Sequence, residues 1–212
     1  MSTKAGDLPA LKEWGAVAHA LLRGRQCLLL RKGGIHEKRF EVGAGRFLLF
    51  PTVAHSHAEQ VRPEHQDLLP AGAADSTEER VVLRCALDVV DVVPVERPEA
   101  LADVGDLHIW TRGSVDARLD FRPRHRLTAL VVRARPLAEP VVVERGPRHR
   151  GCSSWVDLAE DLEHRADDLE HRARADAGDV ITPERLWSHA GPPALDDATL
   201  QRAAGAVRRA LA

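Results

Sequence analysis

The chain has 212 residues, 44% of them hydrophobic and 29% charged, with a formal net charge of −2. A chain of this length buries about 70% of its unfolded surface, which excludes a disulfide-stapled mini-protein, and the small net charge excludes a bulk polycation or an acidic disordered tail. Three cysteines without a Cys-x-x-Cys pair argue against a disulfide framework and a thiolate zinc site, so we expect a reducing, cytoplasmic location with neither a signal peptide nor a membrane-spanning helix.

The first third of the sequence predicts one helix, two strands and two further helices. Apolar residues at helical spacing predict an amphipathic helix over 8–23. The short apolar runs 26–31 and 47–50 predict buried strands, because they are too brief for helices and end at glycine or proline. A capping-box pattern predicts a short helix near His57, and Pro63 is expected to start another.

The middle of the sequence favours strands. Residues 71–76 are expected to form a loop. The valine-rich stretch 80–93 predicts a strand, although its charged residues recur at helical spacing. A short strand is expected over 108–111, and the segments 127–135 and 141–144 predict a hairpin around two prolines.

The segment 157–176 differs in kind, because Asp-Leu-Glu-His-Arg-Ala occurs in it twice with a seven-residue period. It predicts a helix with an apolar seam and a net charge of −5. Two interpretations stay open: the helix lies on its own domain, where it neutralises basic side chains, or it forms a homodimer contact. Two shorter helices are expected after it, from Thr182 and over 195–211.

These elements together predict an α+β fold. We expect a small, mostly antiparallel, barrel-like sheet with an N-terminal helix against it and a helical C-terminal third. The expected division is a core domain over 1–156 and a helical extension over 157–212 that packs on the core.

Several sequence blocks resemble one known family. They are Arg-Lys-Gly-Gly-Ile at 31–35, Phe-Leu-Leu-Phe-Pro-Thr at 47–52, His-Ile-Trp-Thr at 108–111 and Gly-Cys-Ser-Ser-Trp at 151–155. With these blocks the chain resembles the bacterial domain-of-unknown-function family 1802 over most of its length. The heptad segment departs from the family's pattern and looks like an insertion. The resemblance implies domain boundaries but no activity, because the family resembled has no established one.

The turn after the first predicted strand is a candidate anion site. An ammonium from Lys32 and the backbone amides of Gly33 and Gly34, with His36 close by, could converge on a phosphate or carboxylate. The alternative is a solvated turn. The spacing matches neither a Walker loop nor a metal-nuclease motif with a carboxylate two residues before a lysine, so both activities are unsupported.

Three further residues are weaker candidates. His55 belongs to a group of histidines for which helix capping and surface exposure are better explanations than a metal site. Cys152 follows basic residues that would favour a reactive thiolate. The simpler interpretation is that Cys152 is a small side chain packed beside Trp155. No metal and no cofactor are expected.

Basic charge is concentrated between residues 112 and 150, a segment that contains ten arginines and only four acidic residues. If the predicted hairpin forms, both ends of this segment lie at one end of it and form a single arginine cluster. Such a cluster, with tryptophans near it in sequence, suits a phosphate backbone or a single strand of nucleic acid. The residues expected in the cluster are Arg122, Arg124, Arg126, Arg148 and Arg150.

Three functional classes therefore stay open. The first is a binding module for nucleic acid or a phosphorylated small molecule. The second is a hydrolase acting on phosphodiesters, and the third is a protein-interaction domain acting through the heptad helix. The sequence does not decide whether the protein is an enzyme.

Overall fold

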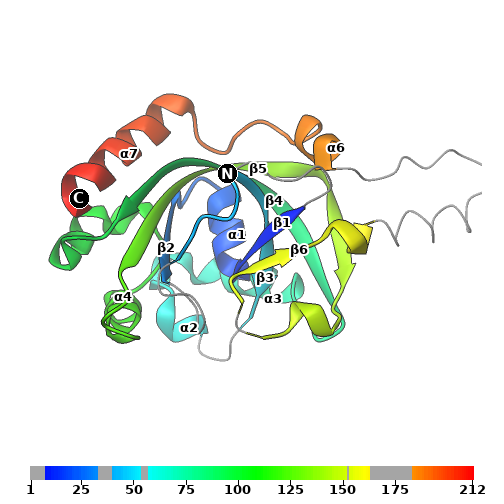
Figure 1. Ribbon diagram of the computed structural model, residues 1–212, viewed down its shortest axis with the longest axis horizontal. Helices are drawn as coiled ribbons and strands as arrows, with labels where there is room; N and C mark the ends of the chain where they lie inside the picture. Colours follow the sequence, from blue (N-terminus) through cyan, green and yellow to red (C-terminus); the bar gives the residue numbers. More distant parts are fainter. Residues whose placement is uncertain (1–7, 33–39, 54–56, 152, 163–182) are drawn as a thin grey trace, which may run out of the picture.

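A mixed sheet, curled into a half-barrel, forms the centre of the computed structural model (Figure 1). The structure describes residues 8–32, 40–53, 57–151, 153–162 and 183–212. Its strands are β1 (Pro9–Trp14), β2 (Leu28–Lys32), β3 (Arg46–Thr52), β4 (Arg80–Pro94), β5 (Leu127–Glu144) and β6 (Trp155–Asp157). They follow the order β2-β5-β4-β3-β1-β6. Because β1 and β3 pair in parallel and the other neighbours pair antiparallel, the predicted α+β class with a mostly antiparallel, barrel-like sheet is confirmed.

Helices surround this sheet. They are α1 (Gly15–Leu22), α2 (His57–Gln60), η1 (Pro63–Leu68), α3 (Leu69–Ala74), η2 (Pro98–Leu107), α4 (Arg112–Asp120), η3 (Pro147–His149), α6 (Pro183–Ser188) and α7 (Asp197–Leu211). In Figure 1, α1 lies beneath the arch of β4 and β5, whereas α7 runs above it. No helix in the described ranges has both the length and the apolar character of a membrane span.

Both faces of the sheet are buried, as alternate side chains of β3 illustrate. Phe47 and Leu49 pack in the core that includes α1 and α7, while Leu48 and Phe50 pack in a second core with β6. This explains why the run reads as continuously apolar in the sequence. An irregularity in β4 between Leu83 and Cys85 changes the face of its odd-numbered side chains, so that Val81 and Leu83 pack in the second core but Cys85 and Leu87 pack in the first.

Three local predictions differ from the structure. The segment 8–23 is not one helix, because residues 9–14 form β1 between β3 and β6 and only 15–22 are helical. The expected loop 71–76 is largely helix α3. The expected strand 108–111 is reduced to a single bridge between Trp110 and Val61. Pairing with β3 and β6 makes residues 9–14 a strand, and packing on α1 accompanies the helix α3, so tertiary contacts decide between conformations that the local pattern leaves open.

The predicted hairpin over 127–144 is wrong. These residues form one strand of 18 residues, β5, which pairs with β4 along most of its length. Pro136 lies inside the strand opposite Cys85, close to the irregularity, where a missing N–H is tolerated. Residues 127 and 144 therefore stand at opposite ends of a strand that would span roughly 55 Å if straight.

The heptad segment is described only at its start. Leu158 and Leu162 are buried in the second core, and Arg148 forms ion pairs with Glu160 and Asp161. The first turn thus buries its apolar side chains on its own domain and directs its acids to a basic residue. Residues 163–182 lie outside the described part of the chain, so the predicted heptad helix and its dimer contact stay predictions.

Candidate functional site

A buried carboxylate at the end of β1 anchors the candidate site. Glu13 is 5% exposed, and its side chain accepts a hydrogen bond from the Trp14 backbone N–H (2.9 Å). Its other oxygen accepts from Nη1 of Arg31 on β2, also at 2.9 Å. A strand that begins in the core thus delivers a charged side chain to a largely buried position, where it needs a partner.

A second guanidinium approaches from α4. Thr111 caps this helix, since its side chain accepts from the Ser114 N–H (3.2 Å). One turn later Arg118 donates back to the Ser114 carbonyl (3.1 Å) and hydroxyl. Its guanidinium carbon lies 4.0 Å from the Trp110 ring centroid and 5.9 Å from that of Trp14. Burial lowers the pKa of Arg118, Glu13 raises it and Arg31 lowers it, so the three charges interact.

The aromatic rings hold these cations in place. Trp14 and Trp110 meet edge to face, with centroids 4.9 Å apart and planes at 89°. The Arg31 guanidinium carbon lies 5.4 Å from the Phe40 ring centroid. Guanidinium groups stacked on aromatic faces lose less freedom when they bind an anion, because their orientation is already restricted.

Lys32 closes the cluster at the other end of α4. Its ammonium donates to the carbonyls of Arg118 (3.0 Å) and Leu119 (2.8 Å), the last turn of that helix. Burial lowers the pKa of Lys32, and Asp120 raises it. The residue predicted as an anion ligand therefore joins β2 to α4. Its predicted neighbours Gly33, Gly34 and His36 lie outside the described residues, so the anion site at this turn stays a prediction.

We call Glu13, Arg31, Lys32 and Arg118, together with the rings of Trp14 and Trp110, the Arg31–Arg118 cluster. It holds three cations against Glu13 and the exposed Asp120, a balance of +1. Among the described residues, the buried Nε of Arg31 has no hydrogen-bond partner. Excess positive charge with a free donor in a partly buried place favours an anion from solution.

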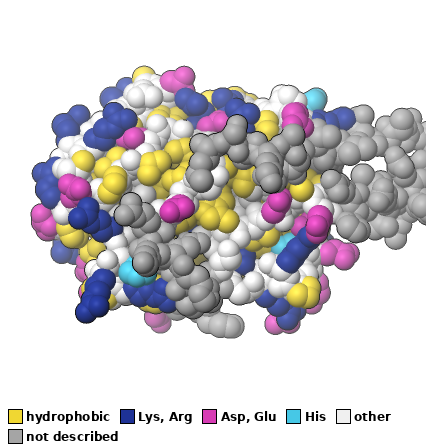
Figure 2. Space-filling view, viewed as in Figure 1, with side chains coloured by type: hydrophobic (Ala, Val, Ile, Leu, Met, Phe, Trp, Pro, Cys, Tyr) yellow, Lys and Arg dark blue, Asp and Glu magenta, His cyan; other side chains and the backbone are white. Residues whose placement is uncertain are grey.

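The single arginine cluster expected from the hairpin does not form. Because β5 is one strand, residues 122–126 and 145–150 lie at its opposite ends. Arg126 forms an ion pair with Glu96 at 3.4 Å, and Arg148 forms ion pairs with Asp161 and Glu160, which raise its pKa. On the face in Figure 2, Lys and Arg side chains are spread around the rim and interleaved with acids.

The remaining predicted site residues have these positions. The φ angle of Arg122 is 51°, its guanidinium lies over the Phe121 ring, and Arg150 is exposed. Trp155 packs against Phe47 and donates from Nε1 to the Glu41 carbonyl. Arg124 lies in the turn between α4 and β5. His55 and Cys152 lie outside the described residues.

The sequence analysis does not single out Glu13, Trp14, Arg31 or Arg118. The helical spacing of apolar residues over 8–23 includes Trp14, whereas Glu13 and Trp14 lie at the end of β1. Arg118 is one arginine of the basic tract 112–150. Its signal was the spacing of four from Ser114, which places both side chains on one face of α4.

A family model described as a domain of unknown function, DUF1802, matches residues 10–171. This match spans well over half of the chain. The chain belongs to the DUF1802 family. The resemblance stated from the sequence blocks is therefore confirmed. The matched residues include every member of the Arg31–Arg118 cluster.

Solved structures similar to this DUF1802 chain include the ASCH protein of Zymomonas mobilis. The native protein matches with a TM-score of 0.45 at 11% identity, over 88% of this chain and 97% of that one. A serine-to-alanine variant matches with a TM-score of 0.47 at 11% identity, over 79% and 99% of the two chains. A tyrosine-to-phenylalanine variant gives 0.46 at 13%, over 76% and 96%. No curated protein matches the chain.

Proposed function

We propose that this DUF1802 protein binds a phosphorylated small molecule at the Arg31–Arg118 cluster. The observation that carries the proposal is the pairing of Arg31 with the buried Glu13, with Arg118 close enough to interact electrostatically with both. Lys32 adds a third cation at the end of α4, and among the described residues the buried Arg31 Nε has no hydrogen-bond partner. Arginine presents several N–H donors in a fixed plane, which suits a phosphate group.

A small ligand fits the charge distribution better than an extended nucleic-acid backbone. A backbone surface needs a row of basic side chains, whereas here the arginines of 122–126 and 145–150 are separated by the whole of β5. The cluster itself has cations for one or two phosphate groups. Binding of a nucleic-acid strand is therefore the alternative that the experiment has to separate.

Calorimetric titration with inorganic phosphate and with AMP tests the proposal. We expect Arg31→Gln and Arg118→Gln each to weaken AMP binding by about ten- to hundredfold, the equivalent of one lost charged hydrogen bond of roughly 1.5 to 3 kcal/mol. Arg208→Gln is the matched control, because Arg208 lies on the exposed side of α7 and pairs with Asp91. Equal affinities in all three variants would refute the proposal.

The dependence of affinity on salt concentration distinguishes binding of a small phosphorylated molecule from binding of a nucleic-acid strand. When the logarithm of the binding constant is plotted against the logarithm of the salt concentration, one or two phosphate contacts give a slope near −1. For a single strand held at many phosphates, the slope becomes more negative by about 0.7 for each contact. We expect AMP and a short oligodeoxynucleotide to show the same shallow slope. A slope several times steeper for the oligonucleotide, with affinity above that of AMP, would favour nucleic acid instead.

A further inference from the structure

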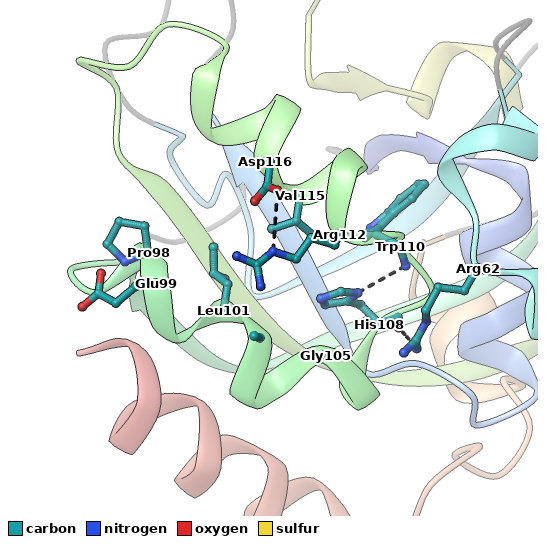
Figure 3. Close-up of a pocket in the computed structure, with 11 residues that line it drawn as sticks. Arg62, Pro98, Glu99, Leu101, Gly105, His108, Trp110, Arg112, Val115 and Asp116 are labelled. Atoms are coloured by element: carbon teal, nitrogen blue, oxygen red, sulfur yellow. Dashed lines mark hydrogen bonds and ion pairs between the residues drawn. The ribbon is translucent and has the colours of Figure 1, made fainter.

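A separate cavity of about 230 Å³ lies between η2, α4 and the segment that carries Trp110 (Figure 3). Leu101, Val115 and Trp110 give it apolar walls that are themselves buried. Glu99 and Asp116 are exposed, so they belong to its outer part. The cavity has apolar walls and a few polar groups, as binding sites for small organic molecules do.

His108 supplies the polar group at the inner end. The side chain lies among the labelled lining residues in Figure 3, and the residue is only 3% exposed. The Trp110 backbone N–H donates to Nδ1 of His108 (3.2 Å), so the neutral ring carries its proton on Nε2. Within the described part of the chain, this Nε2 is buried without a hydrogen-bond partner. A buried donor left without an acceptor costs free energy, which a ligand acceptor would recover.

The charges around His108 select the sign of that acceptor. Arg62 holds the backbone here, because its guanidinium donates to the His108 carbonyl. Burial first, and then the charges of Arg62 and Arg118, lower the pKa of His108 to about 4, whereas Asp106 opposes them. At the ring, the charges of Arg62 and Arg118 therefore outweigh that of Asp106. A ligand that brings negative charge is favoured there, and one that brings positive charge is not.

We propose that this cavity binds a small organic carboxylate, with a carboxylate oxygen accepting from His108 Nε2–H beside Arg62 and a compact apolar body against Leu101 and Val115. Trp110 is the one residue of the Arg31–Arg118 cluster that also lines this cavity, although the charge of Arg118 also acts on His108. The proposal does not rest on the proposed phosphate site, because the ligand contacts His108, Leu101 and Val115 and none of the residues expected to bind phosphate.

The test uses benzoate and benzylamine, which have similar apolar bodies and opposite charges. Nitrogen-15 spectra of the histidine side chains report directly on Nε2, and His108 is assigned by the signal that is lost in His108→Gln. We expect benzoate to shift the His108 Nε2 signal with saturation, and benzylamine to leave it in place. The absence of a benzoate shift, or an equal shift with benzylamine, would overturn the proposal.

Two matched substitutions show whether the shift comes from the cavity. Ala102 is exposed on the cavity's lining, so Ala102→Phe fills the space without removing core contacts. Ala206 lines a different cavity beside Cys27 and Leu195, so Ala206→Phe is the control. We expect benzoate binding to weaken by about tenfold or more in the first variant and to stay unchanged in the second. A benzoate shift that persists in Ala102→Phe would show that benzoate binds outside this cavity. Titration of the same variant with AMP shows whether the substitution also affects the proposed phosphate site.

Discussion

Replacing Glu13 by Gln is the most informative perturbation of the cluster, because it removes the buried carboxylate and keeps the side chain's shape. The Glu13 side chain is 6% exposed, and that of its partner Arg31 is 15% exposed. Removing one member of such a buried pair typically costs about 3 to 5 kcal/mol, since the remaining charge stays desolvated. We therefore expect Glu13→Gln to lower the free energy of unfolding by that amount. For a chain of this size the melting temperature falls by roughly 6 to 20 °C.

The same substitution should strengthen anion binding. Without Glu13, a bound phosphate becomes the nearest negative charge for Arg31 and Arg118, so part of the lost stability returns when phosphate is added. A ligand present at about 100 times its Kd stabilises a fold by roughly 2.7 kcal/mol. Thermal unfolding with phosphate, and with chloride at equal ionic strength, measures this effect. If phosphate raises the melting temperature of both proteins equally, or if the variant is as stable as the native chain, the charge argument is wrong.

Three further predictions concern packing, protonation and reactivity. Gly72→Ala should lower the free energy of unfolding measured in urea by about 2 to 3 kcal/mol or more, because the added Cβ would lie 2.4 Å from the backbone of α1. In the control Gly113→Ala the added Cβ has no atom within 4 Å, so this substitution should be neutral or stabilising. The pKa of His108 is about 4 in the folded protein and 6.5 in the unfolded chain, so His108 contributes stability that is present above pH 6.5 and lost as the pH falls towards 4. Between pH 7 and pH 4.5, the free energy of unfolding should therefore fall by about 2 kcal/mol more in the native chain than in His108→Gln. Cys27 and Cys85 are buried, burial raises the pKa of each, and neither should react with a thiol reagent until the protein unfolds; rapid labelling of either one in the native state would contradict the packing described.

Of the two strands that hold the cluster, the sequence predicts β2 but not β1, which it reads as part of a helix. The short apolar runs at β2 and β3 predict strands, in agreement with the structure, because burial on both faces leaves a strong pattern. The sequence predicts a hairpin in place of the long strand β5, because Pro136 and Pro140 favour a turn in isolation. Only the register with β4, a contact between distant segments, shows that the chain on both sides of residues 137–140 pairs with the same strand, with an irregularity between them.

The chemistry was harder to predict than the strands. The sequence singles out Lys32 because it follows a buried strand, but it does not single out Arg31. The partners of both residues lie far away in sequence, with Glu13 at the end of β1 and Arg118 on α4. Local periodicity carries no information about which charged side chains of separate elements meet. The basic tract was visible as composition, whereas its separation into two ends depends on the topology of the sheet.

The most direct test of the central claim is to observe the guanidinium groups themselves. Nitrogen-15 spectra of arginine Nε–H groups, assigned with Arg31→Gln and Arg118→Gln, would be recorded with AMP and with adenosine, which lacks the phosphate. The account predicts that AMP shifts the Arg31 and Arg118 signals with saturation, that adenosine leaves them in place, and that Arg208 responds to neither. Unmoved Arg31 and Arg118 signals at saturating AMP, or equal shifts with adenosine, would contradict a phosphate site at this cluster.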